Sequence, residues 1–106
     1  MKPPTLAPAF ASYYPIMCEV AREHGYCLAL HGTMARDLDL LAVPWTDEAV
    51  PAEELVEALW GRICWISTKD KVVTGPEDKP HGRRAWCLPM MGGAYMDLSV
   101  MPRVAP

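Results

Sequence analysis

The sequence predicts a small α/β (α+β) domain, in which a mixed or antiparallel sheet of four to five strands carries two helices on one face. Two segments place apolar residues at helical spacing, and four short apolar segments are typical of strands. The length of 106 residues suits one domain. Helices and strands mixed in this order bury their apolar sides by packing as two layers.

The predicted helices cover residues 14–25 and 51–62. In the first, Pro15 suits the opening turn and Gly25 the position after the last turn. In the second, acidic residues gather in the first half, where they complement the helix dipole. Residues 1–12 contain three prolines and no clear period, so we expect an extended arm before a single domain at 13–106.

The predicted strands cover residues 26–30, 36–43, 83–89 and 95–101. The last two flank Gly92-Gly93, which indicates a hairpin. Residues 68–81 are polar and contain two Xaa-Pro pairs, so the sequence predicts a long loop there.

Net charge, apolar segments and cysteine spacing restrict the classes of protein to which this chain can belong. The net charge of -3 does not steer the chain towards nucleic acid, and no apolar segment is long enough to span a membrane. The four cysteines contain no C-x-x-C pair, and the first residues lack a signal-peptide pattern. We therefore expect a cytoplasmic protein with reduced thiols and no membrane partner.

The most informative segment is residues 31–43. Asp37 and Asp39 lie one residue apart, so on a strand their side chains project from the same face. Two like charges at neighbouring positions repel, and a divalent cation would offset that repulsion. A third carboxylate, Asp97, lies in a similar apolar segment near the end of the chain.

This arrangement resembles the DNA polymerase β nucleotidyltransferase superfamily, and the order of elements resembles its minimal domain over most of residues 15–101. The resemblance rests on Gly32-Thr33, on Asp37-Leu38-Asp39 and on Asp97. It implies that the three aspartates are catalytic and hold Mg²⁺, while Gly32 and Thr33 contact phosphate. The chain also resembles small uncharacterised phage and prophage proteins.

Further candidates for binding a nucleotide surround these residues. Lys79, His81, Arg83 and Arg84 form a basic segment that suits phosphate. His31 and Arg36 adjoin the proposed site, and Trp45 is a candidate for stacking on a base. Two alternatives remain open: the two neighbouring aspartates can lie at a solvated strand end, paired with Arg36 or Arg83, and the basic segment can be a solvated loop that balances the acidic second helix.

Three functions therefore compete. The first is nucleotidyl transfer, and the second is a phage protein that binds or sequesters a nucleotide or nucleotide-derived molecule and interferes with host signalling. The second is favoured because only residues 34–36 separate Thr33 from Asp37, a shorter segment than in typical members, and because no second domain holds an acceptor. The third is an inhibitor-like or antitoxin-like module with a protein partner, or a homodimer formed by exchange of the N-terminal arm.

Overall fold

The computed structural model describes residues 8–32, 37–63, 72–90 and 95–103, with the backbone alone for residues 8–12. The elements in chain order are α1 (Pro8–Glu23), β1 (Tyr26–His31), β2 (Leu38–Pro44), α2 (Ala52–Ile63), β3 (Thr74–Asp78), the 3-10 turn η2 (Pro80–Gly82), β4 (Arg84–Pro89) and β5 (Tyr95–Val100).

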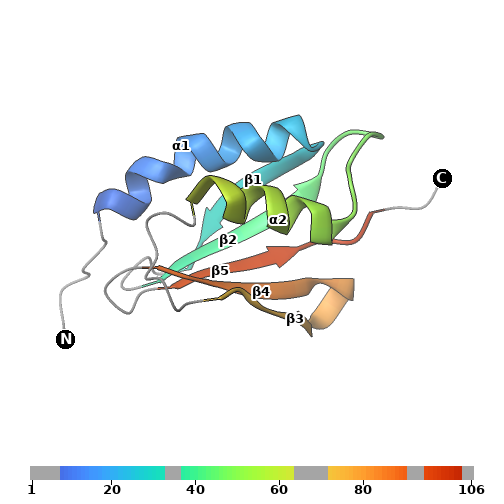
Figure 1. Ribbon diagram of the computed structural model, residues 1–106. Coiled ribbons are helices and arrows are strands. Elements are labelled where there is room, and N and C mark those ends of the chain that lie inside the picture. The colour runs from blue at the N-terminus through green and yellow to red at the C-terminus, as the bar shows by residue number, and fades with distance from the viewer. Residues whose placement is uncertain (1–7, 33–36, 64–71, 91–94, 104–106) are drawn as a thin grey trace.

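The five strands form one mixed sheet in the order β1-β2-β5-β4-β3. The pair β2 and β5 is parallel, and the other three pairs are antiparallel. Both helices lie on the same side of the sheet (Figure 1). The structure thus confirms the predicted α+β class. Within the described part of the chain, no helix covers the opposite side, which we call the open face.

The core lies between the helices and the sheet. Along β2, Leu38, Leu40 and Ala42 point into it and are almost fully buried, because alternate strand residues face the same side. Leu55 and Leu59 of α2 are fully buried against the same layer. Burial of these apolar side chains supplies the main driving force for folding.

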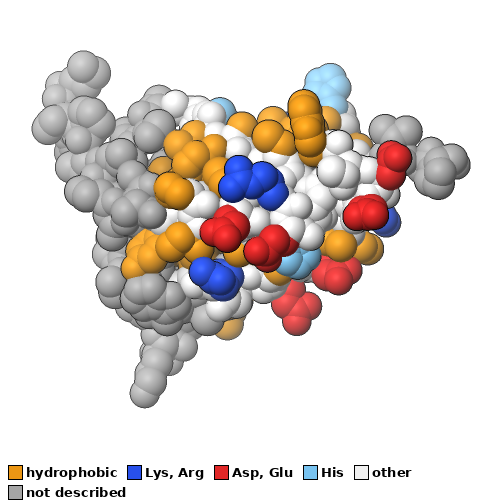
Figure 2. Space-filling model, turned by 90° about the horizontal axis from the view of Figure 1, so that it is seen from above, with side chains coloured by type: hydrophobic (Ala, Val, Ile, Leu, Met, Phe, Trp, Pro, Cys, Tyr) orange, Lys and Arg blue, Asp and Glu red, His pale blue; other side chains and the backbone are white. Residues whose placement is uncertain are grey.

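Charged side chains occupy the outer side of the helix layer. Figure 2 looks down on this side and shows acidic and basic side chains next to one another near its centre, among hydrophobic ones. Such mixed charge is typical of a solvated helix surface. Neither described helix has the length and apolarity needed to cross a membrane.

A glycine joins the turn after α1 to the segment that leads into α2. Gly25 has φ +86°, and its carbonyl oxygen accepts hydrogen bonds from the backbone N–H groups of Trp45 and Thr46. A Cβ atom at this position would collide with the backbone of Ala49. Glycine is therefore required where the turn after α1 packs against the connection between β2 and α2.

The structure differs from the sequence prediction at two elements. Helix α1 begins at Pro8 rather than Tyr14, so residues 8–12 are helical and not part of an extended arm; residues 1–7 lie outside the described part. Proline at the first helical position loses no hydrogen bond, and Pro8 takes that place while Pro15 lies inside the helix. Strand β3 lies within the predicted loop at 68–81.

Candidate functional site

A row of side chains crosses the open face at the beginning of β2 and β5. The strand register pairs His31 with Asp39, Asp39 with Asp97, Asp97 with Cys87, and Cys87 with Thr74. Directly paired residues project from the same side of a sheet. Five side chains from five strands therefore form one line, with two carboxylates next to each other near its centre.

Each of the two central carboxylates makes the charged form of the other less favourable. Neighbouring strands lie about 4.8 Å apart, so Asp39 and Asp97 are close enough to repel. Partial burial and the charge of Asp39 raise the pKa of Asp97 above its ordinary value, although Lys79 and His31 partly offset this. Among the described residues, the opposing effect of Lys79 and His31 is therefore smaller than that of burial and the neighbouring carboxylates.

Asp37 adjoins this pair just before β2. Its Oδ1 accepts a hydrogen bond from the backbone N–H of Tyr95 at 3.1 Å, which connects the start of β2 to the start of β5. Its charge contributes to the raised pKa of Asp97. The structure thus brings the three predicted aspartates to the same end of the open face.

Two of these aspartates line a pocket of about 410 Å³, which we call the open-face pocket. Asp37 and Asp97 share it with Lys79, Tyr95 and Cys87. Burial, followed by the charges of Asp97 and Asp37, raises the pKa of the Cys87 thiol. Cys87 is therefore suited to packing rather than to nucleophilic attack, because the thiolate is the reactive form.

Gly32 approaches the carboxylate of Asp39. Its φ of +78° lies in the left-handed region, and a Cβ atom there would collide with the carboxylate oxygen of Asp39. Glycine permits this approach because it has no side chain. The predicted phosphate-binding glycine is therefore adjacent to a predicted metal-binding aspartate, whereas Thr33 and Arg36 lie outside the described residues.

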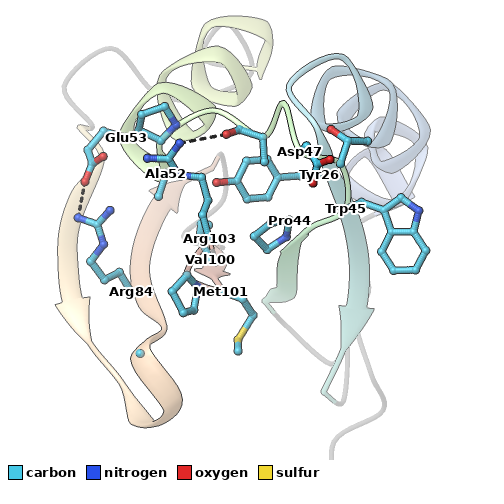
Figure 3. Close-up of a pocket in the computed structure, with 15 residues that line it drawn as sticks. Tyr26, Pro44, Trp45, Asp47, Ala52, Glu53, Arg84, Val100, Met101 and Arg103 are labelled. Atoms are coloured by element: carbon cyan, nitrogen blue, oxygen red, sulfur yellow. Dashed lines mark hydrogen bonds and ion pairs between the residues drawn. The ribbon is translucent and has the colours of Figure 1, made fainter. Parts of the chain in front are cut away.

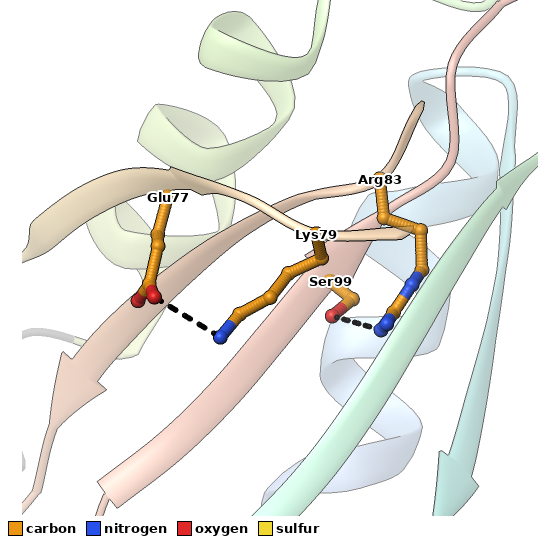
Figure 4. Close-up of polar contacts among 4 residues, drawn as sticks. All are labelled: Glu77, Lys79, Arg83 and Ser99. Atoms are coloured by element: carbon orange, nitrogen blue, oxygen red, sulfur yellow. Dashed lines mark hydrogen bonds and ion pairs between the residues drawn. The ribbon is translucent and has the colours of Figure 1, made fainter. Parts of the chain in front are cut away.

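Two cations of the predicted basic segment flank the open face. Lys79 donates a hydrogen bond to Glu77 at 3.2 Å, and Arg83 donates from Nη1 to the Ser99 hydroxyl at 3.2 Å (Figure 4). Ser99 is only 7% exposed, and Arg83 also donates to the carbonyl of Pro80. The Arg83 guanidinium is therefore held in place two positions along β5 from Asp97.

The other predicted cation lies elsewhere. Arg84 follows Arg83 on a strand, so its side chain points to the helix side, where it forms an ion pair with Glu53 and lies 5.2 Å from the Trp86 ring centroid. Hydrogen bonding to Arg84 is the main reason that the pKa of Glu53 falls below its ordinary value. Arg84 is separated from the aspartates by the thickness of the sheet.

A larger cavity of about 970 Å³ lies at the far end of β2 and β5 (Figure 3). Arg84, Arg103 and Trp45 belong to its lining, and Arg103 donates a hydrogen bond to the carbonyl of Ala49 at 3.2 Å. Trp45 is 75% exposed. It lies beyond the carboxyl end of β2, about 20 Å along the strand direction from Asp39, so it does not share the pocket of the aspartates.

His81 is exposed in the turn η2, with φ +68°, and lines neither cavity.

Three residues of the site were not predicted from the sequence. Ser99 and Cys87 were not named, although Ser99 lies two residues after Asp97 and so occupies the same face. Thr74 was missed because its strand was not predicted.

The donor chemistry suits a hard cation, since carboxylate oxygens are the ligands that Mg²⁺ prefers. Among the described residues, no three His, Cys, Asp or Glu side chains lie in a group able to enclose a metal ion. Mg²⁺ is commonly held by one or two carboxylates together with substrate phosphates rather than by a complete protein cage. The adjacent pair Asp39 and Asp97 fits that mode.

Comparison with protein-family models, with curated proteins and with solved structures finds no match to this chain.

Proposed function

We propose that this chain is a nucleotidyltransferase-like domain that binds a nucleotide through a divalent cation and phosphate contacts on the open face. The observation that carries the proposal is the register pairing of Asp39 with Asp97 on parallel strands. Partial burial and the neighbouring charge of Asp39 both disfavour the charged form of Asp97 and raise its pKa. A cation bound between the two carboxylates would remove this repulsion, and its removal would favour binding of the cation.

Asp39 and Asp97 would hold Mg²⁺, with Asp37 beside them. A bound Mg²⁺ would neutralise charge on the phosphoryl oxygens of the nucleotide and polarise them. His31 pairs with Asp39 on the outer strand of the row, so its ring can orient that carboxylate or contact phosphate. The Asp39 carboxylate occupies the space that a Cβ atom of Gly32 would fill, so a phosphate bound to the cation would lie beside the Gly32 backbone.

The cations of the basic segment would bind the phosphates beyond the metal. Lys79 lines the open-face pocket and acts as a mobile point charge. The Arg83 guanidinium contacts Ser99, which lies two positions along β5 from Asp97, a strand distance of about 7 Å. A planar guanidinium fixed by a buried hydroxyl can bind phosphate through two parallel hydrogen bonds. The open face therefore suits a ligand with several phosphates.

Calorimetry with a nucleoside triphosphate, with and without MgCl₂, tests the proposal. Binding should require Mg²⁺, and Asp39→Asn or Asp97→Asn should weaken it by roughly tenfold or more, because each removes a charged ligand. Binding that is indifferent to Mg²⁺ and to both substitutions would overturn the proposal. Circular dichroism of each variant establishes that the fold persists.

Arg83 and Arg84 provide a matched pair of variants. Arg83→Gln should weaken binding by roughly tenfold, because a charge-assisted contact to phosphate is lost. Arg84→Gln should leave the affinity unchanged, since Arg84 lies on the helix side. Equal effects of the two substitutions would contradict the proposed phosphate path. Pyrophosphate release, in which an acceptor hydroxyl displaces pyrophosphate from the α-phosphorus, distinguishes transfer from binding alone.

A further inference from the structure

Strand β1 forms one edge of the sheet, and its outward backbone groups can be assigned. The backbone N–H of Trp45 donates to the carbonyl of Gly25 at 2.8 Å, so the pair Tyr26 and Pro44 is a non-hydrogen-bonded pair of the antiparallel ladder. The N–H and C=O groups of Tyr26, Leu28 and Leu30 therefore point away from β2. Those of Cys27 and Ala29 point towards it.

The opposite edge, β3, carries features that discourage further pairing. All five of its residues are exposed, and they include Pro76, which has no N–H, and the acidic residues Glu77 and Asp78. Its register with β4 is also broken by a bulge or irregularity. Proline, charge and irregular register are the usual means by which proteins protect an edge strand.

The β1 edge has none of these features within the described residues. The strand Tyr26–His31 contains no proline, no Asp, Glu, Lys or Arg, and no break in its register with β2. Cys27 and Ala29 are exposed on the open face. On the helix side, Tyr14 and Cys18 reach the same edge, where each contacts the carbonyl oxygen of Leu28.

We propose that β1 pairs with β1 of a second copy of this chain, antiparallel and about a two-fold axis at Leu28, to form a continuous ten-stranded sheet. Leu28 then pairs with itself through its outward N–H and C=O groups, and Cys27 lies opposite Ala29 of the partner subunit. The pairing desolvates no charged side chain of the strand. A two-fold axis makes the interface closed, so assembly stops at the dimer.

The hydroxyl of Tyr14 does not prevent this pairing. It donates to the Leu28 carbonyl at 2.8 Å from the helix side, and a carbonyl oxygen has two lone pairs. Among the described side chains, this oxygen accepts, apart from Tyr14, only a weak contact from the Cys18 thiol at 3.9 Å, which an N–H of the partner strand can replace. Small side chains at Cys27 and Ala29 keep the open-face side of the junction free of steric conflict.

Disulfide cross-linking tests this register between the β1 strands of the two copies. Cys27 and Ala29 of the partner subunit form a non-hydrogen-bonded pair, with Cα atoms about 4.5 Å apart, which is within the range that a disulfide bridges. Ala29→Cys should therefore give a disulfide-linked dimer on mild oxidation, visible on a non-reducing gel. The double variant Ala29→Cys with Cys27→Ser should lose this species. Glu77→Cys, on the exposed opposite edge, is the matched control and should not form a dimer of comparable yield.

Light scattering and sedimentation over a wide concentration range provide the second measurement. The wild-type chain should dimerise, and Ala29→Lys should weaken the association by roughly tenfold, because it places like charges at the junction. Ala29 is exposed, so circular dichroism should show the fold of this variant unchanged. A monomeric wild type, a dimer unaffected by Ala29→Lys, or cross-linking without preference for Ala29→Cys would each overturn the proposal.

Discussion

The two faces of β2 perform different tasks. Leu38, Leu40 and Ala42 are buried beneath the helices, while Asp39 and Leu41 are half-buried on the open face. A single strand thus contributes apolar contacts to one side and a carboxylate to the other. Stability comes mainly from the covered side, so the open face can tolerate repelling charges that a core could not.

The largest expected effect is on the covered face. Leu40→Ala should lower the free energy of unfolding by about 3 kcal/mol, because it leaves a cavity at a fully buried position. Urea denaturation followed by circular dichroism measures this loss. Leu41→Ala, the neighbour on the open face, should cost clearly less, since Leu41 is only half-buried. Equal losses would show that the open face is also packed.

An effect of intermediate size on stability is expected at Gly32, whose backbone lies against the Asp39 carboxylate. Gly32→Ala should destabilise the protein by about 1–2 kcal/mol, because alanine is strained at positive φ. It should also displace the Asp39 side chain and weaken Mg²⁺-dependent nucleotide binding. Gly61→Ala, in α2 with open space around it, should instead be neutral or slightly stabilising. A Gly32→Ala variant with unchanged stability and binding would contradict this interpretation.

The smallest expected effect is a gain in stability. Asp97→Asn should stabilise the unliganded protein by about 0.5 kcal/mol at neutral pH, since solvent screens a partly exposed charge. The folded pKa of Asp97 is raised, so its charge destabilises the fold above that pKa. The penalty fades as the pH falls through the raised pKa and is absent below the ordinary carboxyl pKa.

Thermal unfolding of both chains as a function of pH measures this difference. The advantage of Asp97→Asn should shrink steadily on acidification. Asp47→Asn, in an exposed turn, is the control, and it should stabilise the protein clearly less than Asp97→Asn does at neutral pH. A gain that persists at low pH, or a loss at neutral pH, would show that Asp97 is not under repulsion.

The spacing of apolar residues along the sequence was enough to predict four strands and two helices, and strand alternation predicted the common face of Asp37 and Asp39. Strand β3 could not be predicted in this way, because all its residues are exposed and it gains its order by pairing with β4. The start of α1 was misplaced because two prolines offered two starting points, Pro8 and Pro15.

The candidate site was predictable to a different degree. The chemistry of Asp37, Asp39 and Asp97 is visible in the sequence, but the register that pairs Asp39 with Asp97 depends on strands far apart in the chain. The separation of Arg83 from Arg84 was readable, since consecutive strand residues face opposite sides. The remote position of Trp45 was not, because it follows from the path of the chain after β2.

The strand order has a consequence for how the chain is made. β5 comes after the other four described strands in sequence, yet it lies at the centre of the sheet and joins β2 to β4 (Figure 1). Until it leaves the ribosome, the β1-β2 and β3-β4 hairpins have no strand to connect them, and two interior strands expose an edge. Such late, long-range closure slows folding and exposes strand edges to aggregation. Folding of the sheet during synthesis must therefore wait until β5 has left the ribosome.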